Sequence, residues 1–251
     1  ATRVCIFSRG EYNQFLMRKR FKDDARLRFF IGDVRDRWRL CRSFDGVDVV
    51  VHAAALKRIE VGAYNPTEMV KTNIDGAINV VEAANDAKVR KVVALSSDKA
   101  FQPVSPYGQS KALAESIFSA ANDAYGSQAP LFAVCRYGNV WWSTGSVGPI
   151  WSQMLEDGET HVPITDPEAT RFFMRMDEAV DLVLSTIKDM PREIACPTLP
   201  AYRLGDLAEA MGARTIVTGL PVWEKLHESM DGLLWSNTAR RMTVAELREA
   251  L

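Results

Sequence analysis

Short apolar runs alternate with longer amphipathic segments through the first half of the chain. Five runs rich in β-branched or aromatic residues predict strands, over residues 3–7, 27–31, 48–52, 91–96 and 131–136. Several runs, such as Val49-Val50-Val51, are continuously apolar, as expected for parallel strands that helices cover on both faces. The alternation therefore predicts an α/β fold with a Rossmann-like, doubly wound parallel sheet.

Apolar positions at helical spacing predict helices over 65–89, with Pro66 in the first turn, and over 107–124. After residue 139 the alternation loosens and shorter helices are expected, over 151–156, 177–188, 203–211 and 244–251. Thr243 is positioned to cap the last of these, with Glu246 at the third helical position. We expect a nucleotide-binding domain over 1–139 and a smaller, mainly substrate-binding α/β lobe over 140–251, with helix 177–188 packing back on the first domain.

The usual glycine-rich turn of a dinucleotide-binding fold is absent from this sequence. Such a fold opens with a strand, a GxxGxxG turn and a helix whose N-terminus holds the pyrophosphate. No GxxGxxG occurs, and Ala1 directly precedes what is expected to be the second strand. We expect the first βα unit, about 30 residues, to be missing from this chain. The alternative is a truncated or degenerate protein.

Charge and composition exclude several classes of partner. The 31 lysines and arginines nearly balance 32 acidic residues, so no overall field favours nucleic acid or a membrane surface. Four scattered cysteines lack metal-ligand or CxxC spacing and are expected to be reduced structural thiols, and His52, His161 and His227 are expected to be structural. No apolar run approaches the roughly 20 residues of a membrane helix, and no signal peptide is visible. We expect a cytoplasmic protein without a metal.

The chemistry-bearing stretch is Ser96-Ser97-Asp98-Lys99, which closes a predicted strand, followed by Tyr107 and Lys111 on one face of a predicted helix. With its neighbours it resembles the inverting, soluble UDP-N-acetylglucosamine 4,6-dehydratases of the extended short-chain dehydrogenase/reductases, a polysaccharide biosynthesis family. The resemblance covers nearly the whole chain and rests on these segments in order: HAAALK, KTNIDGAINVVEAA, SSDKAFQPVSPYGQSK, RYGNV, GSVGP, PITDPEATRFF and EKLHE.

The resemblance implies a three-step reaction on a bound UDP-sugar: oxidation at C4 by NADP⁺, elimination of water across C5 and C6, and reduction at C6. Tyr107 would be the base of the first step, with Lys111 as the cation that favours its phenolate. Asp98 would protonate the departing hydroxyl, and Lys99 would take the C5 proton. That role requires the pKa of Lys99 to be lowered.

Further site residues are expected on the cofactor side. Ser8 and Arg9 follow a strand where an NAD enzyme would carry an acidic residue, and a hydroxyl with a cation suits the 2′-phosphate of NADP. The resemblance implies further contacts with the cofactor from Asp33, Val34, Ala53, Ala54, Ala55, Asn73, Ser96, Tyr107 and Lys111. Asn73 would also hold the helix of Tyr107. Ser97 is expected on the substrate.

On the substrate side, the resemblance implies contacts from Asn139, Arg171 and Glu224, with Arg171 suited to a diphosphate. The chain departs from the family pattern at Trp141-Trp142 and at Leu220-Pro221-Val222-Trp223. These changes place bulky residues beside the expected pocket and remove a cation that could bind phosphate, so a changed substrate and a loss of function both stay open. Tyr107, where membrane-anchored relatives carry methionine, favours the soluble, C5-inverting branch.

Two alternatives stay open: a UDP-sugar 4-epimerase, which needs no elimination pair, and an inactive relative that only binds NADP or a sugar nucleotide. Relatives commonly form homo-oligomers, and we expect the same here.

Overall fold

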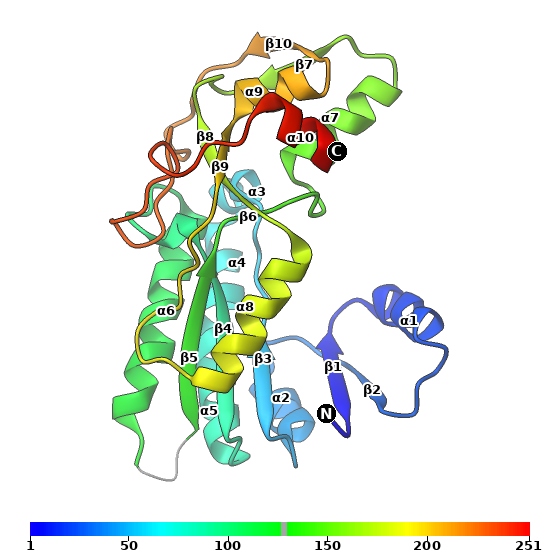
Figure 1. Ribbon diagram of the computed structural model, residues 1–251. Helices are drawn as coiled ribbons and strands as arrows, with labels where there is room; N and C mark the ends of the chain where they lie inside the picture. The colour runs from blue at the N-terminus through cyan, green and yellow to red at the C-terminus, as the bar shows by residue number, and fades with distance from the viewer. Residues whose placement is uncertain (127–129) are drawn as a thin grey trace.

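The computed structural model describes residues 1–126 and 130–251 (Figure 1). Its strands, in chain order, are β1 (Val4–Ser8), β2 (Leu27–Ile31), β3 (Val49–His52), β4 (Lys91–Ser97), β5 (Leu131–Tyr137), β6 (Asn139–Val140), β7 (His161–Ile164), β8 (Thr170–Met174), β9 (Ala201–Arg203) and β10 (Arg214–Val217).

The helices are α1 (Glu11–Arg20), α2 (Arg37–Phe44), α3 (Ile59–Tyr64), α4 (Pro66–Met69), α5 (Gly76–Asp86), α6 (Pro106–Ala124), α7 (Val147–Glu156), α8 (Met176–Asp189), α9 (Leu204–Ala210) and α10 (Val244–Ala250). A π-helical segment, Val70–Asp75, joins α4 to α5, and a 3₁₀ turn, Asp98–Ala100, follows β4.

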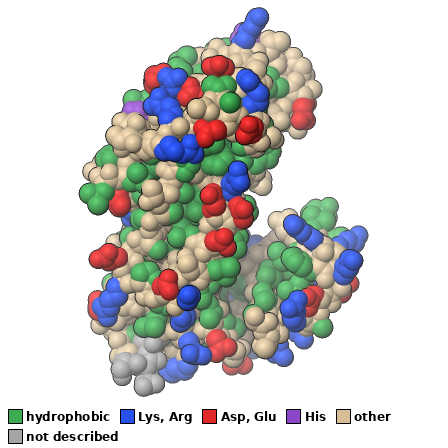
Figure 2. Space-filling model, viewed as in Figure 1, with side chains coloured by type: hydrophobic (Ala, Val, Ile, Leu, Met, Phe, Trp, Pro, Cys, Tyr) green, Lys and Arg blue, Asp and Glu red, His purple; other side chains and the backbone are tan. Residues whose placement is uncertain are grey.

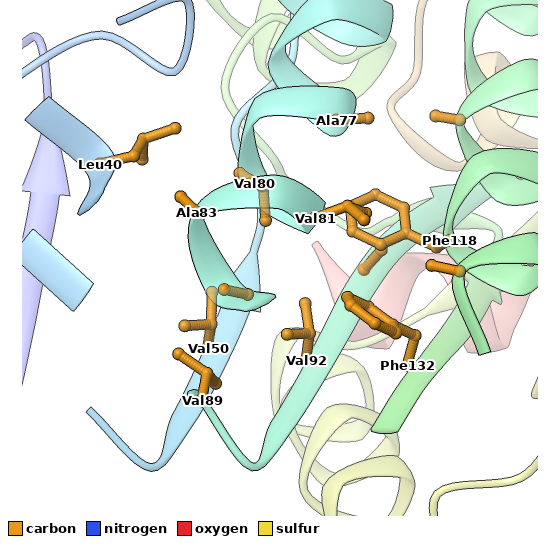
Figure 3. Close-up of a cluster of buried hydrophobic side chains, with 14 of the residues drawn as sticks. Leu40, Val50, Ala77, Val80, Val81, Ala83, Val89, Val92, Phe118 and Phe132 are labelled. Carbon is orange, nitrogen blue, oxygen red and sulfur yellow. The ribbon is translucent and has the colours of Figure 1, made fainter. Parts of the chain in front are cut away.

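Strands β3, β4 and β5 form a parallel sheet with helices on both faces. Helices α5 and α6 cover one face and α8 packs against β4 and β5 on the other (Figure 1). Side chains from α2, α5 and α6 meet the strands in a core that includes Leu40, Val80, Val92, Phe118 and Phe132 (Figure 3). Each such side chain contributes about 1.5–3 kcal/mol by leaving water, so this unit is the best-packed part of the chain.

Helix α6 illustrates how the sequence produces these elements. Ser105 caps its first turn by accepting a hydrogen bond from Gly108 N at 3.1 Å, and Pro106 occupies the first helical position. Its apolar residues Ala114, Phe118 and Ala121 recur every three or four positions and are all buried against the sheet.

Strands β1 and β2 pair in parallel with each other and, together with α1, stand apart from β3 (Figure 1). A cavity of about 450 Å³ lies between β1 and β3, and no ladder joins these two strands among the described residues. Figure 2 shows hydrophobic side chains gathered on the surface of this smaller unit. The parallel pair β1–β2 and the parallel three-stranded sheet β3–β4–β5 lie on the two sides of this cavity.

The second region holds two small sheets. Strand β8 lies between β6 and β9, and β7 pairs in parallel with β10. Helices α7, α9 and α10 pack around a core that contains Trp151, Phe173 and Leu207. Thr243 accepts from Glu246 N at 3.2 Å, and the Glu246 carboxylate accepts from Thr243 N at 2.8 Å, which confirms the cap predicted for the last helix.

The structure confirms the five predicted strands and the helix over 107–124 to within a residue or two. The single helix predicted over 65–89 is instead α4, a π-helical segment and α5 in succession. The apolar periodicity of this stretch does not register the extra residue of a π-turn, which is a local adjustment frequent at functional sites.

Candidate active site

The end of β4 turns sharply so that helix α6 approaches it closely. Ser97 accepts from Lys99 N at 3.2 Å and so begins the 3₁₀ turn. A Cβ on Gly108 would lie 2.3 Å from the Lys99 carbonyl oxygen, a distance that no side chain tolerates. Glycine next to Tyr107 therefore allows the helix carrying Tyr107 and Lys111 to lie against the turn carrying Asp98 and Lys99.

Asp98 and Lys99 form a buried ion pair. The Lys99 Nζ donates to Asp98 Oδ1 at 3.1 Å, and Ser97 Oγ donates to the same oxygen at 2.8 Å. Asp98 is fully buried, and its Oδ2 has no hydrogen-bond partner among the described residues. An unpaired buried carboxylate oxygen is costly unless a ligand satisfies it. Over residues 1–126 and 130–251, this oxygen therefore lacks a hydrogen-bond partner in the ligand-free structure.

The charge state of Lys99 differs from the sequence-based expectation. Burial alone would lower the pKa of Lys99, but the carboxylates of Asp98 and Glu228 outweigh it and raise the pKa above its ordinary value. The expectation of a lowered pKa is wrong for this arrangement. Asp98 is the larger cause, and a second carboxylate, Glu228 Oε1 at 3.7 Å from Nζ, adds to it from far away in the sequence.

The surroundings of Tyr107 also differ from the expected pairing with Lys111. Burial and Asp98 raise the pKa of Tyr107, while the Lys99 charge lowers it in part. Lys111 Nζ donates to the Leu95 carbonyl oxygen at 2.5 Å, and burial lowers the pKa of Lys111 to about 8. The cation that favours the Tyr107 phenolate in this structure is therefore Lys99.

Asn73 connects the loop after β3 to helix α6. Its Oδ1 accepts from Leu56 N at 2.8 Å, and its Nδ2 donates to Leu56 O at 3.0 Å and to Ser110 Oγ at 2.9 Å. The side chain is buried and its amide is used on the protein, so Asn73 steadies the helix of Tyr107, as expected, and offers no free amide atom to a cofactor.

A cavity of about 340 Å³ lies beside Lys99, between the two regions of the chain. Its lining includes Asn139, Arg171, Glu224, Lys225 and Glu228. Asn139 Oδ1 lies 3.4 Å from Lys99 Nζ. The structure thus brings three of the four substrate residues expected from the sequence, Asn139, Arg171 and Glu224, to the same cavity as Lys99. The fourth, Ser97, is not part of its lining.

Arg171 is held in place by the protein around this cavity. It is buried, donates to the Thr170 carbonyl oxygen at 2.7 Å and pairs with the Glu224 carboxylate. Its position is fixed before any ligand arrives, which suits recognition of an anionic group such as a phosphate.

Of the tryptophans expected beside the substrate pocket, Trp223 lines the 340 Å³ cavity, and Trp141 and Trp142 lie outside its lining. Trp141 packs on Phe173 and donates from Nε1 to the Ala250 carbonyl oxygen at 2.9 Å. The Trp142 ring covers Gly148, where a Cβ would approach it to 2.8 Å. Both of these side chains pack within the second region instead.

Seven of the expected cofactor residues line the other cavity, between β1 and β3. They are Ser8, Arg9, Asp33, Val34 and the three alanines 53–55. The other four, Asn73, Ser96, Tyr107 and Lys111, are not part of its lining. The Arg9 guanidinium is more than half exposed and lies 3.7 Å from Asp33 Oδ2. An exposed cation, a hydroxyl and a carboxylate beside small side chains fit the adenosine half of a dinucleotide.

Ser96 and Ser97 occupy different surroundings at the end of β4. Ser96 is buried, and its Oγ has no hydrogen-bond partner among the described residues. The Ser97 hydroxyl is engaged with Asp98. An unpartnered buried hydroxyl points to a group that is present only when a ligand is bound.

Two further observations concern metal sites and membrane spans. Outside residues 127–129, no group of three or more His, Cys, Asp or Glu side chains is arranged to hold a metal ion. Over the same residues, no helix has the length and apolar character needed to cross a membrane.

Sequence reasoning missed Glu228 and Lys225. Both lie in the EKLHE segment that carries part of the resemblance, so a signal was present. Their partners, Lys99 and the Phe101 carbonyl oxygen, are more than a hundred residues away in the chain. Only the fold places them together.

Comparison with known proteins gives one consistent family. A relative from Campylobacter jejuni, named UDP-N-acetylglucosamine 4,6-dehydratase (inverting), is 42% identical over 231 residues, which is 91% of this chain and 69% of that protein. A relative from Rickettsia prowazekii, named UDP-glucose 4-epimerase, is 40% identical over 83% of this chain and 61% of its own length. The crystal structure of Pen from Bacillus thuringiensis superposes with a TM-score of 0.91 at 31% identity, over 99% of this chain and 89% of that one.

The profile of the polysaccharide biosynthesis protein family matches residues 1–244, nearly the whole chain. This match and the identity to the two relatives agree with the Rossmann-type arrangement and with the order of the motifs around β4 and α6. The chain therefore belongs to the polysaccharide biosynthesis protein family.

Proposed function

We propose that this protein is an NADP-dependent UDP-N-acetylglucosamine 4,6-dehydratase, a lyase that inverts C5 and makes a UDP-2-acetamido-2,6-dideoxy-hexos-4-ulose. The observation that carries the proposal is the buried Asp98–Lys99 pair beside Tyr107, with an unpartnered carboxylate oxygen. A simple oxidation at C4 needs one base, whereas elimination of water needs an additional acid and an additional base. The name of the Campylobacter jejuni relative agrees with this reaction.

Bound NADP supplies the oxidation at C4 and the reduction at C6. Tyr107 takes the proton of the C4 hydroxyl, and the Lys99 charge stabilises the phenolate form required for this. Arg9 and Ser8 hold the 2′-phosphate, and Asp33, Val34 and the alanines 53–55 lie along the adenosine half. We assign to Ser96, Tyr107 and Lys111 the remaining contacts with the cofactor.

Elimination follows once C4 is a ketone, because the ketone acidifies the C5 proton. Neutral Lys99 takes that proton, the electron pair forms the C5–C6 double bond, and the C6 hydroxyl leaves as water with the Asp98 proton. In the resting structure the proton is on Lys99 and Asp98 is its anionic partner. Transfer of one proton from Lys99 to Asp98 across the 3.1 Å hydrogen bond makes Lys99 neutral and Asp98 protonated, which are the forms that the elimination requires.

The substrate lies in the 340 Å³ cavity. We assign the diphosphate to Arg171, and the sugar to Asn139, Ser97 and the neighbourhood of Glu224. A nucleotide-sugar substrate fits a cytoplasmic enzyme. That location and a homo-oligomeric state stay predictions, and light scattering of the purified protein tests the second.

The experiment that tests the function is proton NMR of UDP-N-acetylglucosamine incubated with the protein in D₂O, with NADP⁺ or NAD⁺ added in parallel. We expect a C6 methyl signal beside a C4 ketone or its hydrate, with deuterium at C5 taken from solvent. Failure to form the methyl group with either cofactor would overturn the proposal.

A UDP-sugar 4-epimerase is the second candidate, because the Rickettsia prowazekii relative bears the name UDP-glucose 4-epimerase. The Asp98→Asn protein separates the two. A dehydratase loses its acid, so formation of the methyl group falls by about 10²–10⁴-fold, while C4 oxidation continues. An epimerase keeps its turnover, and the 4-epimer appears in the same NMR experiment.

A further inference from the structure

Glu228 is a buried carboxylate from the second region that faces the turn after β4. It is 2% exposed. Leu226, two residues earlier, is hydrogen-bonded to the start of β8, and Ser236 is hydrogen-bonded to Glu228 itself. Glu228 N donates to Ser236 Oγ at 2.9 Å, and Ser236 N donates to the Glu228 carbonyl oxygen at 2.8 Å. Thr170 N donates to the Leu226 carbonyl oxygen at 2.9 Å. The backbone thus fixes Glu228 from both sides.

Two ammonium groups approach this carboxylate. Lys99 Nζ lies 3.7 Å from Oε1, and Lys225 Nζ lies 2.6 Å from Oε2 in an ion pair whose angles do not make a hydrogen bond. Lys225 is itself anchored, since its Nζ donates to the Phe101 carbonyl oxygen at 2.9 Å. Burying a carboxylate costs free energy, which nearby cations have to offset. Lys99 is the cation that does so in the candidate active site.

We propose that Glu228 is a positioning residue that acts through Lys99, holding its amine toward the cavity and stabilising the ammonium that forms there. The inference rests on the proposed dehydratase function and deepens it. During elimination Lys99 gains the C5 proton while Asp98 is still giving up its own, so Asp98 cannot supply a full negative charge. Glu228 supplies a full negative charge beside Lys99, from a position that is fixed before the reaction.

Several charged or titratable groups face Lys99 from the elements packed around it. They are Asp98 on its own turn, Tyr107 on α6, Arg171 on β8, Tyr202 on β9 and Glu228. Arg171 lowers the pKa of Lys99, whereas Asp98 and Glu228 raise it. Removing the Glu228 charge therefore lowers the pKa of Lys99. The ammonium then loses its proton more readily, and the neutral amine is a weaker base.

The test is the pH profile of kcat for C6 methyl formation, compared between the wild type and Glu228→Gln, which keeps the size and one acceptor oxygen. Because the reactive pair, neutral Lys99 with protonated Asp98, holds the same single proton as the resting ion pair, kcat falls at high pH when Lys99 loses that proton. We expect Glu228→Gln to move this limb about one pH unit or more lower and to reduce the plateau about tenfold, with KM changed less than twofold. Glu228→Asp should restore the limb in part.

A matched control is Glu224→Gln, which removes a carboxylate of the same cavity that pairs with Arg171 rather than with Lys99. We expect this variant to raise KM and to leave the pH limb where it is. If Glu228→Gln lowers kcat equally at every pH, or if both variants move the limb alike, Glu228 has a structural or general electrostatic role and the inference is wrong.

A second measurement separates failure of this inference from failure of the proposed function. Labelling with trace acetic anhydride at a series of pH values, read by mass spectrometry, reports the protonation of Lys99 without any turnover. Lys99 lines the cavity and is reachable by a small reagent. Glu228→Gln should shift the labelling curve of Lys99 to lower pH relative to exposed lysines of the same digest. An unshifted curve overturns the inference even in a protein that proves to be an epimerase.

Discussion

The two sides of strand β3 show how differently similar sequences are used. Toward β4 the strand is paired and helices cover the sheet, and five of the seven residues of β4 are buried. Toward β1 the strand faces a cavity, and β1 has no buried residue although its sequence is equally apolar. Val49 and Val51 remain about 40% exposed. An apolar strand pattern predicts where a strand forms, but the burial of that strand depends on which strands and helices pack against it.

The same contrast extends to the helices. On α6, Phe118 is 1% exposed and packs against His52 and Phe132, whereas on α1, Phe15 is 46% exposed. Helix α6 is covered by the sheet and by α5, while α1 contacts only β1 and β2 to any extent. The unit of β1, β2 and α1 therefore contributes little to the stability of the chain compared with the β3–β4–β5 unit.

The largest expected effect tests this contrast through a matched pair of substitutions. Phe118→Ala should lower the free energy of unfolding by about 3–5 kcal/mol, because it removes contacts and leaves a cavity in the core. Phe15→Ala should cost less than about 1 kcal/mol. Urea unfolding followed by circular dichroism measures both. Equal costs would show that the smaller unit is as well packed in solution as the larger one.

A pH effect of intermediate size should arise within the packed unit from Lys111. Burial lowers its pKa to about 8 from an ordinary value of 10.5. Between these values the unfolded chain binds more protons than the folded one, so this residue makes stability rise with pH over that window. Below about pH 8 it is charged in both states and its full burial cost applies.

Lys111→Met should therefore reduce the slope of unfolding free energy against pH between pH 8 and 10.5, by up to about 1.4 kcal/mol per unit. Lys188→Met, on the exposed face of α8, is the control and should leave the slope unchanged. A slope that is the same in wild type and Lys111→Met would mean that Lys111 is hydrated in solution.

The smallest expected effect belongs to the open side of β3 and concerns cofactor choice. Arg9→Ala should raise the KM for NADP⁺ about tenfold and leave the KM for NAD⁺ nearly unchanged, because NAD⁺ lacks the 2′-phosphate. Arg28→Ala, an arginine of the neighbouring strand β2, is the control and should affect neither. Equal weakening of both cofactors by Arg9→Ala would show that Arg9 supports the fold of the loop.

Much of the first region could be predicted from the sequence, because its apolar residues recur at the period of a strand or of a helix. The loop residues Ser8, Arg9 and Asp33 were also predicted together, since the ends of parallel strands meet at one edge of a sheet. The strands β7, β8, β9 and β10 were not predicted. They are short, and their pairing depends on contacts distant in the sequence.

The pKa of Lys99 shows why a motif was insufficient at the site itself. Asp98 and Lys99 adjoin in the chain, so their pairing could be predicted, but the pKa of Lys99 is also raised by Glu228, 129 positions later. Likewise Trp141 and Trp142 directly follow the RYGNV segment, yet their rings pack into the second region. Nearness in sequence to a motif did not predict nearness to the cavity.

The arrangement around β3 has a mechanical consequence. The segment 32–36 joins β2 to α2. Asn79 Nδ2 on α5 donates to Val34 O in this segment at 3.0 Å, and Arg39 Nε on α2 donates to Ile31 O at the end of β2 at 2.8 Å. Because Gly32, Asp33 and Val34 line the cavity between β1 and β3, these two contacts help to set the width of that cavity.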